Sequence, residues 1–473
     1  MLFNSIPFLF FFPISVILFF LVPVRFRNVW LLLCSYVFYL SQGQKPYAIV
    51  FLLYSTLLTW ITCDIIYKRG LNFKKISLFI CVILNLLPLV LFNLTGSGLF
   101  TKGSSGTVDL LAPIGISFYT LQTVTYVIDC YKGEMQPEKS FVNYALYVSF
   151  FPYILSGPIE RAKSFLPQLR EPAEDGTDTH RFDPIRVKEG LFCMLWGYFL
   201  KLVVSSRLHI LTDLVYSNYK TLSGAEILAG VIAYSIELYC DFAGYSAIAF
   251  GAARVLGFSV SPNFKQPYCS LSVSEFWRRW HISLSSWLRQ YIYIPLGGNR
   301  RGRGMKYRNV LVVFLASGFW HGADPTFLLW GLLHGICQVI EDCGKAVFDR
   351  IGKCLRVFIT YVIVMLLWIP FRAKDLSEAA GVFLGLFKDF SLKYWIDGSL
   401  TKLGLGTYNL LFVTIATVIV LIFDLFCHRK ECEIYSVLDH TKVYLRFAFY
   451  YLLIIMILFS TNLSTTEFLY QGF

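Results

Sequence analysis

Apolar stretches of roughly the length of a membrane span recur along almost the whole chain, separated by short polar loops. A helix needs about 20 mostly apolar residues to cross the hydrocarbon core of a bilayer. The pattern therefore predicts an all-α, polytopic integral membrane protein. The first five runs, which make up the N-terminal spans of residues 1–140, are 7–24, 28–43, 46–67, 76–94 and 110–131.

The loops between these runs predict the direction in which the chain threads the membrane. Arg25 and Arg27 follow the first run, and Lys and Arg residues concentrate in loops 68–75 and 131–139. We assign these loops to the cytoplasm, because cytoplasmic loops carry an excess of Lys and Arg. The first run lacks a preceding basic segment and a small-residue cleavage site. It is therefore interpreted as a retained span, not a signal peptide, with its N-terminus outside.

The middle of the chain is less regular. Run 143–159 is short and ends in the helix breakers Ser156, Gly157 and Pro158, which favours a re-entrant or half-span element. The mixed-charge loop 160–187 follows and is predicted to cap the cytoplasmic side. Runs 189–204 and 226–257 resume the membrane pattern. The second is too long for one straight span and contains Glu237, Asp241 and Gly244.

Beyond residue 308 the apolar runs return to the end of the chain. With no soluble segment and no convincing internal repeat, the sequence predicts one membrane-embedded domain, 1–473. Within it we expect a core at 141–345, which holds the candidate chemistry, and C-terminal spans at 346–473. The later runs are 309–320, 326–340, 355–372, 376–390, 407–427 and 443–461.

Composition narrows the class of protein further. Hydrophobic residues make up 56% of the chain and charged residues only 15%, which excludes a water-soluble enzyme. The net charge of +12 lies in short loops where the positive-inside rule already explains it, so nucleic acid is not an expected partner. The 12 cysteines form no CxxC pair and no zinc-like spacing with histidine, so they are interpreted as small buried hydrophobic residues and no metal is expected.

A histidine, His321, interrupts an apolar region at SGFWHGADPTFLLWGLLHG. Asp324 followed by Pro325 is typical of an N-cap and the first residue of a new helix. One helix should therefore end near His321 and another begin at Pro325, as two pieces too short to cross alone. Non-helical backbone is tolerated at membrane depth where it lines a cavity or is buried in protein. His321 is thus a candidate functional residue, with a structural histidine as the alternative, whereas His334 on the unbroken second helix favours helix packing.

A second candidate segment is SVSEFWRRWHISLSSWLRQ. Ser272 and Glu275 match a capping box, which predicts an interfacial helix over 273–290. Trp277, His281, Leu284 and Leu288 then share one face, so His281 would lie on the apolar side of a basic amphipathic helix. His281 is thus a candidate functional residue that faces inward. The alternative is that the helix serves only as an anchor, lying at the cytoplasmic interface with its Trp and Arg residues in membrane lipid.

The loop PLGGNRRGRGMKYR carries five basic residues, which are Arg300, Arg301, Arg303, Lys306 and Arg308. It either sets topology and binds anionic lipid or docks an acidic donor such as a phosphate-bearing cofactor or carrier protein. The chain contains no GxSxG, HExxH, Walker or GxGxxG motif, which disfavours standard hydrolases, metalloproteases and ATP-driven pumps. A histidine without an evident protein nucleophile suits general-base activation of a hydroxyl.

The two histidine segments together, WRRWHISLSSWLRQYIYIPLGGNR and SGFWHGADPTFLLWGLLHG, resemble the membrane-bound O-acyltransferase (MBOAT) superfamily, in its alginate O-acetyltransferase-like bacterial branch. The motifs APIGISFYTLQTVTYVIDCYKG, FFPYILSGPIERAKSFLPQL and YCDFAGYSAIAFGAARVLGF follow the same branch in order. The resemblance covers nearly the whole chain and is weakest after about residue 375. It implies a ring of membrane helices around a thinned centre, with re-entrant or half-span helices that carry the catalytic histidine.

The resemblance also implies a reaction and its residues. His321 matches the essential histidine of the family and His281 its second signature position. The enzyme would take an acyl group, acetyl in the leading interpretation, from a cytoplasmic acyl-CoA or acyl-carrier protein, with no tightly bound cofactor. An exported polysaccharide would be the acceptor, reached through periplasmic acetyltransferase partners from the bacterial inner membrane. Further candidates for substrate binding are Trp277, Arg278, Arg279, Trp280, Arg289, Asn299, Trp320, Asp324 and Asp241.

This chain departs from the branch at two positions. It has Ala247 where an acidic residue often follows GYS, and Gln290 where Asp is common, so the resemblance assigns no role to a carboxylate at either position. Three alternatives to polysaccharide O-acetylation stay open. Two lie within the superfamily, D-alanyl transfer to teichoic acid and peptidoglycan O-acetylation, and the third is a transporter in which His321 relays protons or binds solute.

Overall fold

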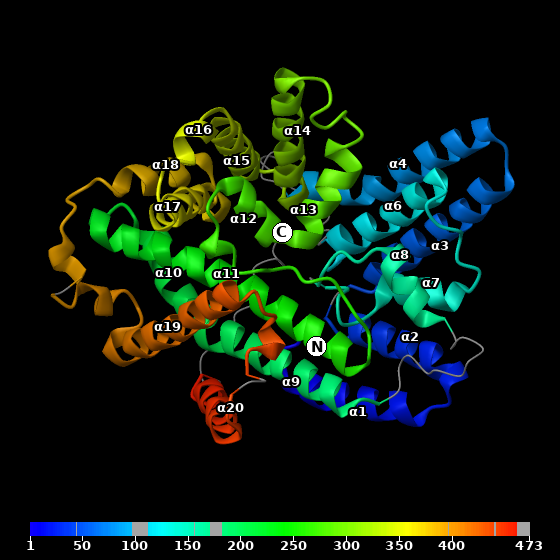
Figure 1. Cartoon of the computed structure of the whole chain (residues 1–473), viewed down its shortest axis with the longest axis horizontal. Coiled ribbons are helices and arrows are strands. Elements are labelled where there is room, and N and C mark those ends of the chain that lie inside the picture. The colour runs from blue at the N-terminus through cyan, green and yellow to red at the C-terminus, as the bar shows by residue number, and fades with distance from the viewer. Residues whose placement is uncertain are drawn as a thin grey trace. The chain divides into compact units, whose positions relative to one another are not determined.

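A computed structural model of the chain describes residues 1–43, 45–96, 112–155, 157–170, 182–395, 397–438 and 441–460. Over these ranges the chain is helical and contains no strand, which confirms the all-α prediction (Figure 1). Ser156, the stretch 171–181 of the predicted cytoplasmic loop and residues 97–111 lie outside the described residues.

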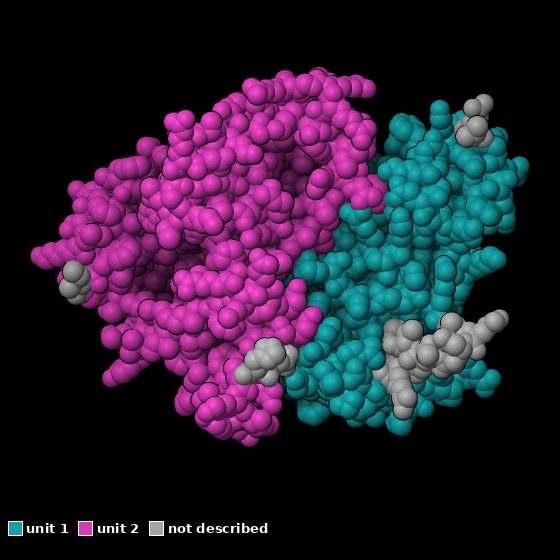
Figure 2. Space-filling model, in the orientation of Figure 1, with its two compact units in different colours: residues 1–194, 245–262 teal, residues 195–244, 263–473 magenta. Residues whose placement is uncertain are grey.

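The chain forms two compact units, residues 1–194 with 245–262 and residues 195–244 with 263–473 (Figure 2). The first unit contains eight of the elements that the structure describes, and helices α9 and α11 run from one unit into the other. Its elements are α1 (Ile6–Leu21), α2 (Val24–Leu40), α3 (Tyr47–Lys68), α4 (Leu71–Gly96), α6 (Ile116–Lys132), α7 (Phe141–Ser149), α8 (Ala162–Phe165) and η1 (Leu166–Leu169). The two connecting helices are α9 (Pro184–Tyr198) and α11 (Gly224–Val255).

The second unit holds both candidate histidines. Its helices are η2 (Phe199–Ser205), α10 (Ser206–Asn218), η3 (Pro267–Cys269), α12 (Val273–Arg279), α13 (Ile282–Leu288), η4 (Arg289–Tyr293), α14 (Arg303–His321), α15 (Pro325–Cys343), α16 (Lys345–Phe348), α17 (Lys353–Arg372), α18 (Leu376–Gly385), η5 (Leu392–Trp395), η6 (Ser399–Lys402), α19 (Gly406–Lys430), η7 (Ile434–Ser436) and α20 (Val443–Leu458).

Six helical stretches in the described part of the chain are long and apolar enough to cross a membrane. They are Tyr47–Lys68, Phe73–Thr95, Pro184–Asn218, Gly224–Val255, Lys353–Arg372 and Gly406–Lys430. Helices α1 and α20, at 16 residues each, are apolar but shorter. The chain is therefore a multi-pass membrane protein, as its apolar runs predict.

Hydrogen bonds between side chains join the helices of the first unit. The Ser55 hydroxyl of α3 donates to Asn85 Oδ1 of α4 at 3.1 Å and lies 3.0 Å from the Thr123 hydroxyl of α6. The Asn85 amide donates to the same Thr123 hydroxyl at 3.2 Å. All three side chains are buried. Polar side chains hold membrane helices together in this way because lipid offers them no alternative partner.

The predicted run 189–204 is wrong in extent. Helical structure is continuous from Pro184 to Asn218, through a π-helical segment, η2, that contains Lys201. The predicted run stops at residue 204 because Ser205, Ser206 and Arg207 follow it. Those residues are buried against the rest of the second unit and therefore do not end the helix. Run 226–257 is a single helix, α11, of 32 residues.

Helices α14 and α15 form a hairpin in which the two backbones pack directly against each other at glycine residues. Each has 19 residues, so each is about 28 Å long at 1.5 Å per residue, and the expectation of two half-length pieces is wrong. The sequence pattern missed the first turns of α14 because they lie in the basic loop. A Cβ atom on Gly318 would overlap the carbonyl oxygen of Phe327, and one on Gly331 would overlap that of Phe314. The two backbones therefore touch.

The Gly318→Ala substitution should destabilise this hairpin, because the added methyl group has no space against the α15 backbone. We expect a loss of about 1–3 kcal/mol, the usual cost of overpacking, visible as a lower unfolding temperature in detergent. Gly304→Ala, on the same helix but with no atom near its Cβ position, is the matched control and should leave the unfolding temperature unchanged or slightly raised. Equal unfolding temperatures for the two variants would contradict the close contact.

Candidate functional site

His321 is the last residue of α14, where the predicted helix break is confirmed. Gly322 caps the helix, with its backbone N–H donating to the Gly318 carbonyl at 3.2 Å. Asp324 is the N-cap of α15 and Pro325 its first residue, as the sequence predicts. The Asp324 carboxylate makes no capping hydrogen bond and is half-buried. His321 therefore sits at a turn between two closely packed helices.

Aromatic rings surround the His321 imidazole, which is only 3% exposed. The Trp320 ring centroid lies 4.7 Å away, and Trp330 of α15 and Phe371 of α17 each lie 5.2 Å away, with their planes nearly perpendicular to the imidazole. Phe327 lies further out at 6.5 Å. The enclosure keeps bulk water from the imidazole, so a proton that it accepts would come from a bound molecule.

The prediction of one helix over 273–290 is wrong. Helix α12 ends at Arg279 and α13 begins at Ile282. Between them, His281 has φ 44° and ψ 55°, in the left-handed region. The start of the helix is as predicted, because the Ser272 hydroxyl accepts from the Glu275 backbone N–H at 3.0 Å. The Glu275 carboxylate bonds instead to the Leu271 N–H, so the capping box is not reciprocal.

A segment from earlier in the chain holds this kink open. The Lys265 N–H donates to the Arg279 carbonyl at 3.0 Å, and the Ile282 N–H donates to the Asn263 carbonyl at 2.9 Å. The Asn263 side chain also accepts from the Ser283 hydroxyl at 2.6 Å. The backbone groups that a continuous helix would pair internally find partners here. The periodicity of 273–290 gives no sign of this, because the bonding partners come from another part of the sequence.

The kink places His281 beside His321. The ring centroid of Trp320 lies 5.9 Å from that of His281, and the same ring contacts His321. Phe242 of α11 packs edge-on against His281 at 4.7 Å. His281 is 1% exposed, and the two imidazoles are close enough to interact electrostatically. We call His281, His321 and the rings of Trp320, Trp330, Phe371 and Phe242 the histidine site.

Trp277 and Trp280 belong to a buried aromatic cluster next to this site. The Trp277 indole N–H donates to His334 Nδ1 at 3.2 Å, and its ring lies 5.6 Å from Trp330. Trp280 packs against Trp368 at 5.0 Å. Both tryptophans are at most 8% exposed, so they are buried in protein and do not anchor a helix in lipid. The hydrogen bond to His334, on the glycine-rich face of α15, agrees with the packing interpretation of that histidine.

Two of the charged candidates form ion pairs of their own. Arg279 pairs with Glu275 at 2.7 Å, and Asp241 forms a buried ion pair with Lys201. Asn299 is exposed, as are Arg278 and Arg289. In the basic loop Lys306 pairs with Asp342 at 2.6 Å, whereas Arg300, Arg301 and Arg303 are exposed.

Sequence reasoning missed three rings of the site, Trp330, Phe371 and Phe242, which come from three other helices. Nothing local distinguishes them from other aromatic residues of an aromatic-rich membrane protein. Lys201, the partner of Asp241, was missed as well. It had a detectable signal, because a lysine within an apolar run is rare unless it is paired.

No cluster of three or more His, Cys, Asp or Glu side chains suited to a metal ion occurs in the ranges that the structure describes. The histidine site offers two imidazoles and apolar ring faces. Such a set can take up a proton and shield a reacting centre from water.

Comparison with known proteins places this chain in a family. Residues 137–352 match the sequence profile of MBOAT, the membrane-bound O-acyltransferase family. The chain is 34% identical to the Pseudomonas syringae pv. tomato protein named "Probable alginate O-acetylase AlgI", over 88% of this chain and 81% of the relative. It is 35% identical to the Azotobacter vinelandii protein of the same name, over 88% and 84%. A Helicobacter pylori peptidoglycan O-acetyltransferase is 33% identical, over 82% of this chain and 80% of the relative.

The matched segment, 137–352, contains both histidines and the α14–α15 hairpin. This chain belongs to the membrane-bound O-acyltransferase family and is an O-acyltransferase.

Proposed function

We propose that this enzyme transfers an acetyl group from a cytoplasmic thioester donor to a hydroxyl acceptor, for O-acetylation of an exported, alginate-like polysaccharide. The observation that carries the proposal is His321, buried among aromatic rings at the turn between α14 and α15, with His281 beside it. Identity of about one third to proteins named as alginate O-acetylases, over most of both chains, supports the substrate class.

His321 acts as the general base. Its neutral imidazole accepts the proton of the incoming hydroxyl as that oxygen attacks the thioester carbonyl carbon. The tetrahedral intermediate then collapses, the carbon–sulfur bond breaks, and the leaving thiolate takes the proton from His321. An ester and a free thiol result, with no net release of protons. The aromatic enclosure slows the competing attack by water, which would hydrolyse the donor.

His281 has a supporting role. The imidazoles of His281 and His321 both contact the Trp320 ring. From this position His281 can orient the acceptor or donate a hydrogen bond to the oxyanion of the intermediate. A residue in the left-handed region is uncommon unless the surrounding structure enforces it. We assign this strain to placing the imidazole, because the kink is what turns it towards His321.

The exposed arginines attract the donor. Coenzyme A and the prosthetic arm of an acyl-carrier protein both carry phosphate, which arginine binds well. Arg278 is exposed on α12, three residues before His281, and Arg300 and Arg301 are exposed just before α14, at the opposite end of that helix from His321. Arg289, Asn299 and Asp324 are further candidates for donor or acceptor contact. Trp277, Trp280 and Arg279 act through packing, and Asp241 through its ion pair, as their contacts support.

We also propose a cellular location and orientation for the enzyme. We place the enzyme in the bacterial inner membrane with its N-terminus outside and the basic loop in the cytoplasm. The core at 141–345 carries the chemistry within one membrane domain. Periplasmic acetyltransferase partners would pass the group on to the polysaccharide.

Peptidoglycan is the second candidate acceptor, favoured by the Helicobacter pylori relative. Teichoic acid D-alanyltransferases match less of the chain, for example 26% identity over 48% of it, and support that reaction less well. The acceptor is identified by measuring ester-linked acetate separately on secreted polysaccharide and on muramic acid residues of the cell wall.

His321→Ala should reduce acetyl transfer at least ~10²-fold, because it removes the base that accepts the hydroxyl proton. The measurement is ester-linked acetate on envelope polysaccharide, with equal amounts of each variant in the membrane. His334→Gln is the matched control, since that histidine is equally buried but packs against Trp277. It should keep most of its activity per folded molecule. Normal acetate levels with His321→Ala would refute the proposed base.

His281→Asn should lower turnover while the protein stays folded. Asn tolerates the left-handed backbone conformation better than most residues, so this variant keeps the kink and removes the imidazole. His281→Ala should in addition lower the unfolding temperature, since Ala disfavours that conformation. Near-normal turnover with His281→Asn would return His281 to a purely structural role.

Arg300→Ala combined with Arg301→Ala should raise the KM for acetyl-CoA several-fold and leave kcat nearly unchanged, because exposed charges steer the donor without touching the reacting atoms. The effect should shrink as salt is added. Lys393→Ala with Lys402→Ala removes two exposed charges elsewhere and should leave KM unaltered. The same increase in KM in both double variants would contradict a specific docking role.

A further inference from the structure

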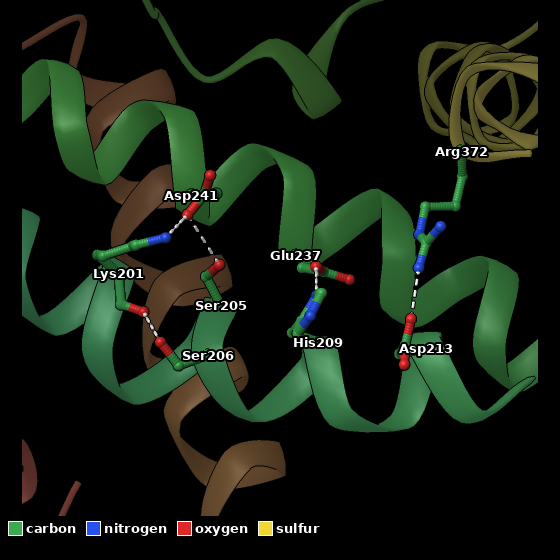
Figure 3. A network of polar contacts seen from close by, with 8 residues as sticks. All are labelled: Lys201, Ser205, Ser206, His209, Asp213, Glu237, Asp241 and Arg372. Carbon is green, nitrogen blue, oxygen red and sulfur yellow. Dashed lines mark hydrogen bonds and ion pairs between the residues drawn. The ribbon is translucent and has the colours of Figure 1, made fainter. Parts of the chain in front are cut away.

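A row of ionisable side chains lies between the helical stretch Pro184–Asn218, in its η2 and α10 segments, and α11 (Figure 3). Both are long enough to cross the membrane. Lys201 pairs with Asp241, which also accepts from the Ser205 hydroxyl at 3.2 Å. Four residues after Ser205, His209 Nδ1 lies 2.8 Å from Oε1 of Glu237, which comes four residues before Asp241. His209 and Glu237 belong to neither the histidine site nor the proposed acyl transfer.

The exposed fraction of the side chains falls from Asp213 to Glu237. Asp213 is 60% exposed and pairs with Arg372 of α17 at 2.8 Å, and that arginine is 16% exposed. His209 is 31% exposed, whereas its partner Glu237 is only 1% exposed. The row therefore runs from a solvent-accessible ion pair to a buried carboxylate.

Four buried polar atoms around Glu237 have no hydrogen-bond partner among the residues that the structure describes. They are Glu237 Oε2, Thr212 Oγ1, Tyr216 Oη and Arg372 Nε. Glu237, Thr212 and Tyr216 are each at most 1% exposed. Buried polar groups in folded proteins are almost always paired, so a cluster of four indicates a partner other than protein.

These four atoms belong to one neighbourhood. Thr212 and Tyr216 are one turn apart on α10, on the side that carries His209, which bonds Glu237. The Arg372 guanidinium lies 5.4 Å from the centre of the Tyr216 ring. Tyr216 in turn packs against Tyr234 of α11 at 5.9 Å, one turn before Glu237.

We propose that water molecules bind among Thr212, Tyr216, Glu237 and Arg372 and connect the His209–Glu237 pair to the solvent that reaches Asp213. The donors and acceptors that the four unpaired atoms require are those that water provides. The carboxylate oxygen needs a donor, the Arg372 N–H needs an acceptor, and the two hydroxyls can be either. Water supplies both roles and binds where two to four polar groups converge.

Hydration gives the His209–Glu237 pair a function that a sealed ion pair would lack. One proton shared between Nδ1 and Oε1 can exchange with the connected water, so this is a proton-exchange site inside the protein. It also explains how two candidate spans tolerate so many polar groups. In each of these two helical stretches, 78% of the most apolar 18 residues is buried inside the protein. The polar groups therefore face protein and water and not lipid.

Hydroxyl-radical labelling of the intact protein in membranes tests the proposal, because radicals made from water modify the side chains that water contacts. With water carrying heavy oxygen, Tyr216 should gain the label several-fold faster than Tyr144. Tyr144 is a matched control, since it is 0% exposed and its hydroxyl is already paired with Thr59 at 2.6 Å. An equally slow rate for both tyrosines would overturn the proposal, whether the space is dry or filled by another ligand.

Two further measurements separate bound water from local unfolding and loss of fold. Val215 neighbours Tyr216 on α10 and is 0% exposed. After correction for intrinsic reactivity it should stay protected, and labelling equal to that of Tyr216 would indicate that α10 opens, which contradicts bound water. Thr212→Val keeps the side-chain shape and removes one ligand of the water. It should lower Tyr216 labelling while the unfolding temperature stays close to that of the unchanged protein, and undiminished labelling would overturn the assigned site. None of these readouts depends on acyl transfer.

Discussion

The contact of α14 with α15 at their glycines is the constraint on which the histidine site depends. Gly318 and Gly331 let each backbone rest against a carbonyl of the other helix, so the two helices lie closer than side chains would allow. That distance brings Trp330 of α15 against His321 at the end of α14. A wider hairpin would leave the imidazole exposed to water and would separate it from the ring that encloses it.

The second half of the site depends on a break in local structure. His281 reaches the Trp320 ring, which also contacts His321, at the point where α12 stops. Helix α12 stops at Arg279 because residues 263–265 pair with the backbone on either side of the kink. The strained conformation of His281 costs free energy of order 1–3 kcal/mol, which these hydrogen bonds offset. The proposed base is thus held by a rigid hairpin and its neighbour by a braced kink. Both arrangements fix the imidazoles before substrate binds.

The two units contain different examples of paired polar side chains. In the first unit neutral side chains such as Ser55, Asn85 and Thr123 satisfy one another and join the helices. In the second, Lys201 and Asp241 form a buried ion pair and His209 pairs with the buried Glu237, with unpaired atoms left over around Glu237. The π-helical turn at Lys201 strengthens this contrast, because such turns are frequent at functional sites.

The sequence by itself determined the membrane class, most helix positions, the capped start of α12 and the break after His321. All of these follow from local rules, which are apolar run length, capping side chains and the Asp-Pro pair that begins a helix. The length of α14, the left-handed turn at His281, the rings around the imidazoles and the partners of Asp241 and Glu237 were decided only by the tertiary structure. Their causes are hydrogen bonds and packing between segments distant in sequence. A periodic pattern records which face of a helix is apolar, but it does not record which neighbour that face will meet.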